Sequence, residues 1–467
     1  MDKKFYVTTP IYYVNDRPHI GHAFTTCMAD VLSRWHKTEG EKVFFLTGAD
    51  EHGAKIAAAA AAVAKSEKEF VDEKTNDFKN VWKKLDIKYD NFLRTTDAKH
   101  IEAVEKALEK LFEQNLIYKE KYEGLYCIAC EQYKTKDDLV NGRCPEHNIE
   151  PILMKEDSYF FKLSHFGKML EKKISSDELE IQPKERKNEI LNFIKKGLKD
   201  ISISRRNVKW GVPLPFDKSY TAYVWVDAFL NYLTGLGWDG NAEHCPEMWP
   251  PDIQLMSKDI LRVHATIWPG ILLALGFPLP KKMFIHGYFT INSQKMSKSL
   301  GNVIWPEELI EKFGVDGTRY LLISSLGYGQ DGDVSWNKLK EKYNADLANN
   351  LGNLVSRVLK LNENIKAEVD KEKPRIKNLD KLFEEIKLKE ILDRIWEQVN
   401  WANKYIEEKK LWDLARTNPK EAKKVLRELL SSISEIAEKI NPFMPETSER
   451  IKKILKTGKS ELLFPRT

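Results

Sequence analysis

The chain has 467 residues, 42% of them hydrophobic, and this length exceeds what one core normally accommodates, so two or three domains are expected. The most apolar stretch, residues 265–280, contains three prolines and is shorter than the roughly 20 apolar residues of a membrane span; the N-terminus also lacks the pattern of a signal peptide. The net charge is only +5, and we expect a cytoplasmic protein without a membrane partner.

The first fifty residues predict a strand, a helix and a second strand. Residues 5–9 (FYVTT) and 43–47 (VFFLT) are strand-like, and apolar residues recur at helical spacing from Ile20 to Trp35. A strand–helix–strand unit of this length is typical of a parallel α/β sheet, whose ligand lies beyond the carboxyl ends of the strands.

His19, Ile20, Gly21 and His22 (HIGH) open this helix after the first strand. Backbone N–H groups and the positive end of the helix dipole favour phosphate there, and the two imidazoles add donors. Taken alone, four residues are a weak signal, and two structural histidines are the alternative interpretation.

Two further helices are predicted, one from the capping box of Ser66 and Glu69 and one over residues 97–115. A cysteine cluster then interrupts the pattern, so residues 116–207 are interpreted as an insertion.

The cysteine cluster has the spacing C-x2-C-x13-C-x2-H, which suits tetrahedral zinc with four protein ligands. Four protein ligands leave no open position on the metal, so the spacing predicts one structural Zn²⁺ per chain. The four residues are Cys127, Cys130, Cys144 and His147. The alternative is a coincidental group of buried cysteines.

Strand-like patterns return at residues 220–226 and 283–286. A polar loop follows at 295–299 (KMSKS), with ammonium groups on Lys295 and Lys298 that suit phosphate. From residue 336 onward the pattern is helical and only two of the 23 glycines occur, which predicts a domain boundary and a helical bundle. This part has 29 basic against 22 acidic residues, as suits a polyanionic partner, although a solvated helical surface is the alternative.

HIGH and KMSKS, in this order and on these elements, resemble the class I aminoacyl-tRNA synthetases. The resemblance implies a Rossmann-type catalytic domain in which both motifs hold Mg²⁺-ATP while an amino-acid carboxylate attacks the α-phosphorus. It assigns transition-state stabilisation to His19, His22, Lys295 and Lys298. It assigns ATP binding to Gly21, Lys258, Asp259, Met296 and Ser297.

Residues 10–13 (PIYY), 46–53 (LTGADEHG) and 223–232 (YVWVDAFLNY) resemble the substrate-binding segments of the methionyl-tRNA synthetase family. The resemblance places the substrate ammonium on Asp50 and its side chain in a pocket of Ile11, Tyr13, Trp225, Ala228 and Tyr232, closed by His264. An aromatic slot suits the polarizable thioether of methionine. For any one of these positions, an ordinary aromatic core residue is the alternative.

The same resemblance implies an all-α anticodon-binding bundle, with Asn353, Arg357 and Trp412 reading the anticodon loop. The partners implied are methionine, ATP and tRNA(Met), including the initiator, and the expected state is a monomer. The domains predicted are the two halves of the catalytic domain, residues 1–115 and 208–335, the zinc-knuckle insertion at 116–207, and the bundle at 336–467. An insertion of this size leaves no room for the large editing domain that weak discrimination between aliphatic side chains demands.

Two other classes of protein remain as alternatives. A tRNA-binding or tRNA-modifying protein without activation chemistry would not need both motifs. An adenylate-forming nucleotidyltransferase that does not use tRNA would not need the basic helical part.

Overall fold

The computed structural model describes residues 3–128, 132–134, 138–145, 148–206, 208–291, 294–296, 301–369, 376–459 and 461–467. The chain forms two compact units. The first comprises Met1–Arg17, Lys42–Lys79 and Tyr89–Ile285, and the second comprises Pro18–Glu41, Asn80–Lys88 and His286–Thr467. In the part of the chain described, no helix is long and apolar enough to cross a membrane.

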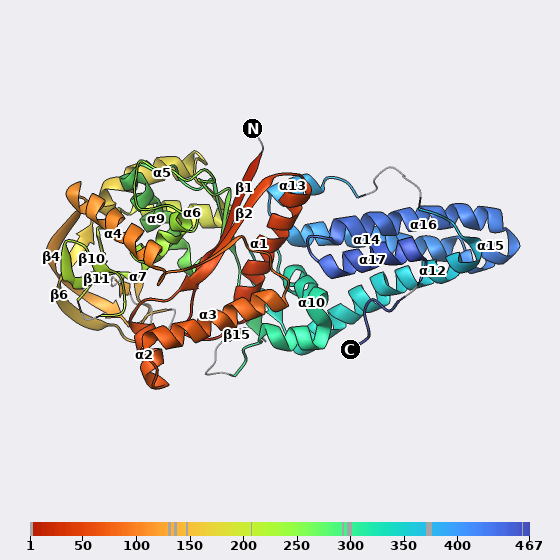
Figure 1. Cartoon of the computed structure of the whole chain (residues 1–467), viewed down its shortest axis with the longest axis horizontal. Helices are drawn as coiled ribbons and strands as arrows, with labels where there is room; N and C mark the ends of the chain where they lie inside the picture. Colours follow the sequence, from red (N-terminus) through yellow and green to blue (C-terminus); the bar gives the residue numbers. More distant parts are fainter. Residues whose placement is uncertain are drawn as a thin grey trace. The chain divides into compact units, whose positions relative to one another are not determined.

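A six-stranded sheet in the order β3-β2-β1-β12-β13-β7 forms the centre of the first unit (Figure 1). The pairs β3–β2, β2–β1, β1–β12 and β13–β7 are parallel, which confirms the parallel α/β fold and the strands predicted at residues 5–9, 43–47 and 283–286. The strand order reverses between β1 and β12, and ligands of such sheets bind at this switch point. The strands are β1 (Lys4–Tyr13), β2 (Lys42–Asp50), β3 (Asn91–Arg94), β7 (Glu180–Gln182), β12 (Ile253–Ser257) and β13 (Lys282–His286).

One face of this sheet packs on helices to form a single hydrophobic core. Tyr6, Leu46 and Met256 point into it from β1, β2 and β12, because side chains of a strand alternate between its two faces. The helices that cover this face contribute apolar residues at helical spacing, such as Ala103, Val104 and Ala107. They include α4 (Ala98–Glu113), α5 (Gly167–Ser175), α6 (Lys184–Lys195) and α9 (Leu261–Leu275).

The predicted helix over residues 97–115 is confirmed as α4, and the capping box begins α3 (Glu67–Lys84). The Glu69 N–H donates to Ser66 Oγ over 3.3 Å, and the Ser66 N–H donates to the Glu69 carboxylate over 3.1 Å. Helix α2 (Ala54–Ala62) contains the alanine-rich segment of the chain.

The strand predicted at 220–226 is only partly correct. Strand β11 (Asp217–Ala222) ends before Tyr223, and two short helices follow, α7 (Val224–Phe229) and α8 (Asn231–Thr234). The N–H groups of Val226 and Asp227 donate to the Tyr223 carbonyl over 2.8 and 3.3 Å and so close a helical turn. The pattern of an apolar run of this length fits either a strand or a helix. In this segment Asp227 forms hydrogen bonds with residues far away in the sequence, described below, and these bonds favour the helix.

The segment predicted as an insertion contains a second sheet, in the order β5-β4-β6-β8. Its strands are β4 (Ile117–Cys127), β5 (Gln132–Lys134), β6 (Ile152–Phe161) and β8 (Ile201–Ser202). Strand β7 of the same segment pairs with β13 and thereby extends the main sheet. A three-stranded sheet, β10-β11-β9, follows, with β9 at Ser204–Arg205 and β10 at Pro213–Leu214.

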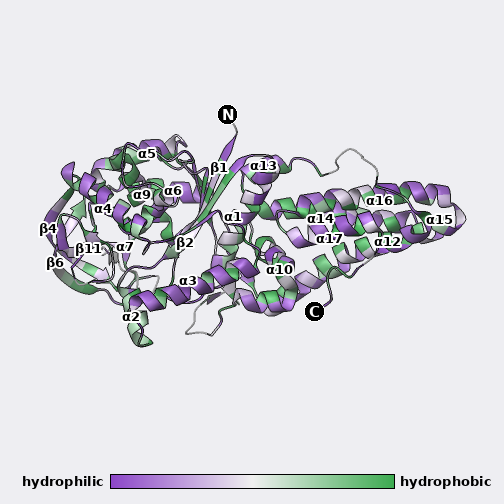
Figure 2. Cartoon of the chain, viewed as in Figure 1, coloured by the Kyte–Doolittle hydropathy of each residue, from purple (hydrophilic) through white to green (hydrophobic). Residues whose placement is uncertain are grey.

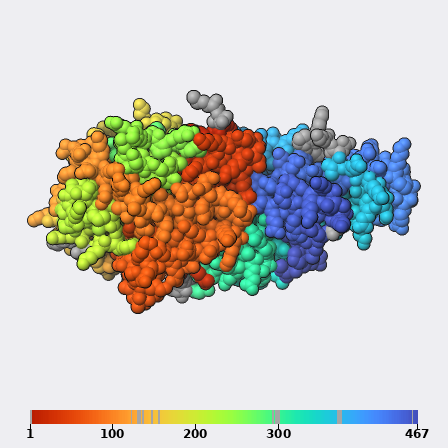
Figure 3. All heavy atoms as spheres, in the orientation of Figure 1, coloured from red at the N-terminus to blue at the C-terminus, as the bar shows by residue number. Residues whose placement is uncertain are grey.

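The second unit contains α1 (Ile20–Thr38), a small sheet of β14 (Phe289–Ile291), β15 (Gln294–Lys295) and β16 (Gly332–Val334), and helix α10 (Pro306–Ser325). All regular structure described beyond residue 336 is helical, as predicted. Figure 2 shows green and purple residues alternating along these helices, and their atoms are coloured from blue-green to blue in Figure 3. The helices are α11 (Trp336–Lys342), a π-helix (Tyr343–Gly352), α12 (Asn353–Ile365), α13 (Leu379–Glu384), α14 (Leu388–Glu408), α15 (Leu411–Thr417), α16 (Pro419–Ile440) and α17 (Pro445–Thr457).

Candidate active site

The carboxyl ends of β1 and β2 bring three of the predicted methionine-binding residues to one edge of the sheet. Tyr13 lies opposite Asp50, and Ile11 lies opposite Gly48, in the parallel register of the two strands. A Cβ atom at Gly48 would lie 2.3 Å from the Leu93 carbonyl oxygen and 2.8 Å from Ile11 Cγ2. Glycine is therefore required there for β1, β2 and β3 to pair this closely.

The other predicted pocket residues come together on α7, α8 and α9. The ring of His264 packs edge-on against Trp225, with centroids 5.8 Å apart, and its Nε2 lies 3.0 Å from the Tyr232 hydroxyl. Ala228 stands one helical turn after Trp225 and is buried. Phe229 was not among the predicted pocket residues, yet its ring lies 4.9 Å from that of His264 at an angle of 85°. These side chains form an aromatic wall around one imidazole.

The hydrogen bonds of His264 define its tautomer. Its Nδ1 lies 2.9 Å from the Ile260 carbonyl oxygen, which can only accept, so Nδ1 carries the proton. Nε2 is therefore the acceptor, and the Tyr232 hydroxyl donates to it. Burial lowers the pKa of His264 to about 4, although the Ile260 carbonyl and Asp259 act in the opposite direction. The imidazole is neutral at physiological pH, as suits an apolar slot.

Directly after Asp50, Glu51 is fully buried in a network of charged and hydroxyl groups. Arg94 Nε donates to its carboxylate over 2.7 Å, and the hydroxyls of Thr75 and Thr96 donate as well. The Trp210 indole N–H donates to the Glu51 carbonyl oxygen. This network holds the chain directly after the residue predicted to bind the ammonium.

His52 and Asp227 form a second buried contact near Asp50, which the sequence analysis did not find. His52 Nδ1 lies 2.7 Å from Asp227 Oδ2, and His100 Nε2 lies 2.9 Å from Asp227 Oδ1. Burial raises the pKa of Asp227, but the charge and hydrogen bonds of His52 and His100 outweigh it and lower that pKa to about 2. Only the polar Asp227 within an apolar segment could have signalled this contact.

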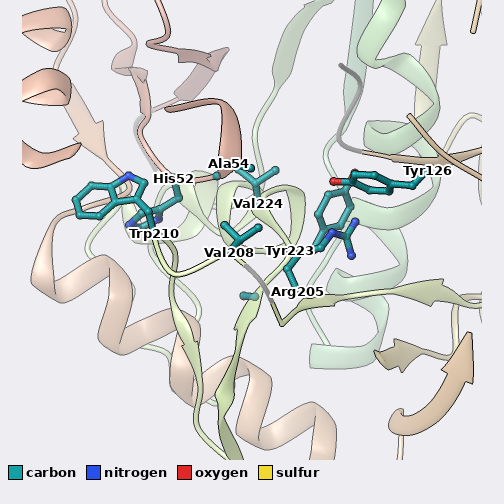
Figure 4. A pocket seen from close by; sticks show the side chains of 10 residues that line it. His52, Ala54, Tyr126, Arg205, Val208, Trp210, Tyr223 and Val224 are labelled. Atoms are coloured by element: carbon teal, nitrogen blue, oxygen red, sulfur yellow. The ribbon is translucent and has the colours of Figure 1, made fainter. Parts of the chain in front are cut away.

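A pocket that is open to solvent lies beside His52. Figure 4 shows Trp210 next to His52, and Tyr126 near Arg205 and Tyr223. The Arg205 guanidinium lies 4.2 Å from the centroid of the Tyr223 ring and 5.4 Å from that of Tyr126. The full lining is His52, Gly53, Ala54, Tyr126, Arg205, Val208, Trp210, Ala222, Tyr223 and Val224.

The HIGH segment lies in the second unit, where His19 caps helix α1. The Gly21 N–H donates to His19 Nδ1 over 3.0 Å, and the His19 N–H donates to His22 Nδ1 over 3.3 Å. Both Nδ1 atoms are thus acceptors, so a neutral ring carries its proton on Nε2. Burial and the neighbouring His19 lower the pKa of His22 well below its usual range. The two rings stack with centroids 3.9 Å apart and, when neutral, carry their Nε2–H groups at a helix N-terminus, where anions are favoured.

Residues on both sides of the KMSKS loop contact the beginning of α1. Before the loop, Phe289 packs edge-on against Phe24 with ring centroids 5.3 Å apart; after it, the Ile304 carbonyl accepts from the Ile20 N–H over 3.3 Å. Lys295 ends β15 and Met296 follows it, whereas Ser297 and Lys298 lie outside the described residues.

The predicted ribose-binding residue lies in the first unit, at the carboxyl end of β12. Lys258 and Asp259 belong to a 3-10 turn, Lys258–Ile260, and the Ser257 hydroxyl donates to the exposed Asp259 carboxylate. Because β12 is the neighbour of β1 in the parallel sheet, this turn lies at the same edge as Tyr13.

Two of the four predicted zinc ligands, Cys127 and Cys144, are buried, with 1% and 0% of their surface exposed. Cys144 lies in a tight turn, where its carbonyl accepts from the Asn148 N–H over 2.8 Å. Cys130 and His147 lie outside the described residues, and the described part of the chain holds no group of three or more candidate metal ligands.

The predicted anticodon residues lie on the helical bundle of the second unit. Asn353 and Arg357 stand one turn apart on α12, and Arg357 Nη2 pairs with Glu407 Oε1 on α14 over 2.6 Å. Trp412 is the second residue of the short helix α15 and has 36% of its surface exposed, whereas Leu411, which begins the helix, is fully buried. An exposed tryptophan beside a buried leucine is available for stacking.

Comparison with known families supplies the class of protein. Residues 5–152 and 147–359 match the family described as tRNA synthetases class I (M), and residues 357–466 match the anticodon binding domain of methionyl tRNA ligase. Together with the parallel sheet and the HIGH and KMSKS motifs, these matches define a class I aminoacyl-tRNA synthetase.

Individual relatives narrow the assignment. The chain is 44% identical to a methionine–tRNA ligase of Caldanaerobacter subterraneus, over 97% of this chain and 74% of that protein. It is 40% identical to the corresponding ligase of Streptomyces coelicolor, over 96% and 89%. A solved structure of Mycobacterium tuberculosis methionyl-tRNA synthetase with methionyl-adenylate superposes with a TM-score of 0.90 at 34% identity, covering 97% of this chain and 94% of that one. The chain belongs to the methionyl-tRNA synthetase family.

Proposed function

We propose that the chain carries out the family reaction with the residues described above: it activates methionine with ATP to methionyl-adenylate and pyrophosphate, then transfers methionine to the 3′ end of tRNA(Met). Both the initiator and the elongator tRNA are substrates, and the reaction takes place in the cytoplasm by a monomer.

The observation that carries this proposal is the aromatic wall around a neutral imidazole. Trp225, Tyr232 and His264 offer ring faces and edges to a thioether, which interacts favourably with aromatic rings. Asp50, at the end of β2, binds the methionine ammonium, and Ile11 and Tyr13 on the neighbouring strand complete the slot with Ala228.

The nucleotide chemistry requires positioning and charge stabilisation, and no side chain has to act as a nucleophile. The methionine carboxylate attacks the α-phosphorus of Mg²⁺-ATP in line, and negative charge grows on the phosphoryl oxygens as pyrophosphate leaves. The Nε2–H groups of His19 and His22 and the ammonium groups of Lys295 and Lys298 bind these oxygens, assisted by Met296, Ser297 and the backbone at Gly21. Asp259 and Lys258 hold the adenosine.

The zinc-knuckle insertion is part of the proposal. The two described thiols, Cys127 and Cys144, are buried although Ile128 and Val140 beside them are 57% and 60% exposed. Burial of these sulfur atoms, while neighbouring aliphatic side chains are exposed, suits a role as ligands of a structural metal. With Cys130 and His147, they would hold one Zn²⁺, which supplies structural cross-linking and takes no part in adenylate formation.

We further propose the division of labour along the chain. Residues 1–115 and 208–335 form the Rossmann-type catalytic domain, residues 116–207 the zinc-knuckle insertion, and residues 336–467 the anticodon-binding bundle. Within that bundle Asn353, Arg357 and Trp412 read the anticodon loop, because single-stranded bases are recognised by stacking and by hydrogen bonds to their edges.

An ATP–pyrophosphate exchange assay with each of the twenty amino acids tests the proposal. Methionine alone is expected to support rapid exchange, because it fills the aromatic slot while its ammonium reaches Asp50. Comparable exchange with leucine or isoleucine would contradict the assignment. The variant Lys298→Ala should lower kcat far more than it changes the KM for methionine, since the ammonium acts on the phosphates.

A further inference from the structure

Four buried polar side chains of the first unit form a continuous series of hydrogen bonds, here termed the buried polar chain. It runs through His52, Asp227, His100 and Thr234, which are at most 9% exposed. His52 Nδ1 lies 2.7 Å from Asp227 Oδ2, Asp227 Oδ1 lies 2.9 Å from His100 Nε2, and His100 Nδ1 lies 2.7 Å from Thr234 Oγ1.

The buried polar chain joins the segments that carry the proposed methionine contacts. His52 follows Asp50 by two residues, and Asp227 stands between Trp225 and Ala228 on α7. Thr234 ends α8, two residues after Tyr232, and His100 lies in α4. The ammonium end of the site and its aromatic wall are therefore connected through one carboxylate.

Helices α7 and α8 depend on such tertiary bonds for their orientation. They contain six and four residues, which is too short for a helix to be stable by itself. The carboxylate of Asp227 is fully buried, and a buried charge persists only when it is paired and hydrogen-bonded. It accepts an N–H from each imidazole, so removing its charge affects both segments at once.

We propose that His52, Asp227, His100 and Thr234 are positioning residues that set the distance between the ammonium-binding carboxylate and the thioether-binding wall, and thereby the affinity for methionine. The inference rests on the proposed function and adds residues that act on the substrate only through others. A shift of about 1 Å between the two walls would weaken methionine binding markedly, since such displacements are costly in preorganised sites.

Two isosteric variants, Asp227→Asn and Thr234→Val, test the proposal in the full chain. Initial rates of pyrophosphate exchange are measured with methionine varied at saturating ATP and with ATP varied at saturating methionine. Asp227→Asn is expected to raise the KM for methionine about tenfold or more, because it weakens two hydrogen bonds to a charged group. Thr234→Val removes the hydroxyl that bonds to His100 Nδ1, together with its bond to the Leu230 carbonyl in its own helix, and should raise that KM about fivefold. In both variants, kcat and the KM for ATP should change by less than about threefold.

The matched control is Thr318→Val. Thr318 is also fully buried and donates one hydrogen bond, to the Gly314 carbonyl over 2.7 Å, but it lies in α10 of the second unit. This variant should leave both KM values unchanged. Melting temperatures of all variants separate a loss of folded protein from a loss of affinity.

The outcomes distinguish a failure of the proposed function from a failure of the positioning role. If the parent chain shows no methionine-dependent exchange, the proposed function itself is wrong. If the parent is active, an unchanged methionine KM in Thr234→Val and Asp227→Asn overturns the positioning role, as does a proportional loss of kcat and of affinity for both substrates. Should Asp227→Asn fail to fold, the methionine KM of Thr234→Val decides the question.

Discussion

His264 shows at the scale of a single residue how burial selects one protonation state. Its Nδ1–H is bonded to the Ile260 carbonyl and its Nε2 accepts from Tyr232, so both nitrogens are used only by the neutral ring. A second proton would convert Nε2 into a donor facing a hydroxyl and place a charge among aromatic side chains. The fold therefore disfavours the imidazolium, in accord with a pKa of about 4.

This depressed pKa predicts a pH dependence of stability. Between the unfolded value of 6.5 and the folded value of about 4, the unfolded chain binds more protons at this residue, so stability falls as the pH falls through that interval. The full contribution, about 3 kcal/mol, is present above pH 6.5 and lost near pH 4. Urea unfolding from pH 7 to 4 should show a shallower decline for His264→Gln than for the parent. Parallel declines in the two proteins would contradict this role of His264.

For the zinc-knuckle insertion, we predict that its folding depends on the bound metal. Cys144→Ala should release the single zinc and loosen the lobe that contains β4 to β6, because structural zinc contributes about 10 to 16 kcal/mol in small peptides. Elemental analysis of the parent and variant, with limited proteolysis of residues 116–207, measures this. Two zinc ions per chain, or none in the parent, would refute the single knuckle, and Cys245→Ala is the matched control because Cys245 is exposed.

Helix α15 carries the prediction for anticodon reading. Trp412→Ala should lower the efficiency of tRNA charging at least about tenfold, because a stacking platform is worth roughly 1 to 3 kcal/mol per base. Pyrophosphate exchange should be unchanged, since methionine activation uses other residues. An equal loss of both activities would mean that Trp412 supports the fold, and the anticodon role would then be abandoned.

A helix or strand can be predicted from the sequence when the interactions that favour it are made by residues close together in the chain. The amphipathic helix α4 and the strands β1 and β2 follow from short-range periodicity and were correctly predicted. Residues 220–226 were not, because the contacts that favour a helix at Asp227 come from residues 175 and 127 positions away along the chain. The motifs and the family resemblance led to the prediction that His264 and Trp225 line the pocket. They could not reveal the buried polar chain, whose histidines stand in unrelated segments.

Arg319 joins distant segments of the second unit, so its substitution is predicted to lower the stability of the folded chain. Its guanidinium is fully buried and donates to Asp30 Oδ2 over 2.7 Å, to the Leu85 carbonyl over 3.0 Å and to the carbonyls of Pro442 and Phe443 over 2.9 and 2.8 Å. These bonds link α1, the end of α3, α10 and the loop before α17.

Arg319→Lys should destabilise the protein by on the order of 3 kcal/mol, because a lysine keeps the charge but cannot reproduce the planar fork of donors. Arg416→Lys is the control, since the Arg416 side chain is 76% exposed and pairs only at the surface. Denaturant unfolding measures both. Equal midpoints for the two variants would show that the buried guanidinium is dispensable.

A crystal structure with a non-hydrolysable analogue of methionyl-adenylate tests most directly whether this chain activates methionine in the slot between Asp50 and His264. We expect the thioether to contact the rings of Trp225, Tyr232 and His264, the ammonium to lie within hydrogen-bond distance of the Asp50 carboxylate, and the ribose to reach Asp259. A thioether located away from His264, or an ammonium bound by a residue other than Asp50, would contradict this expectation.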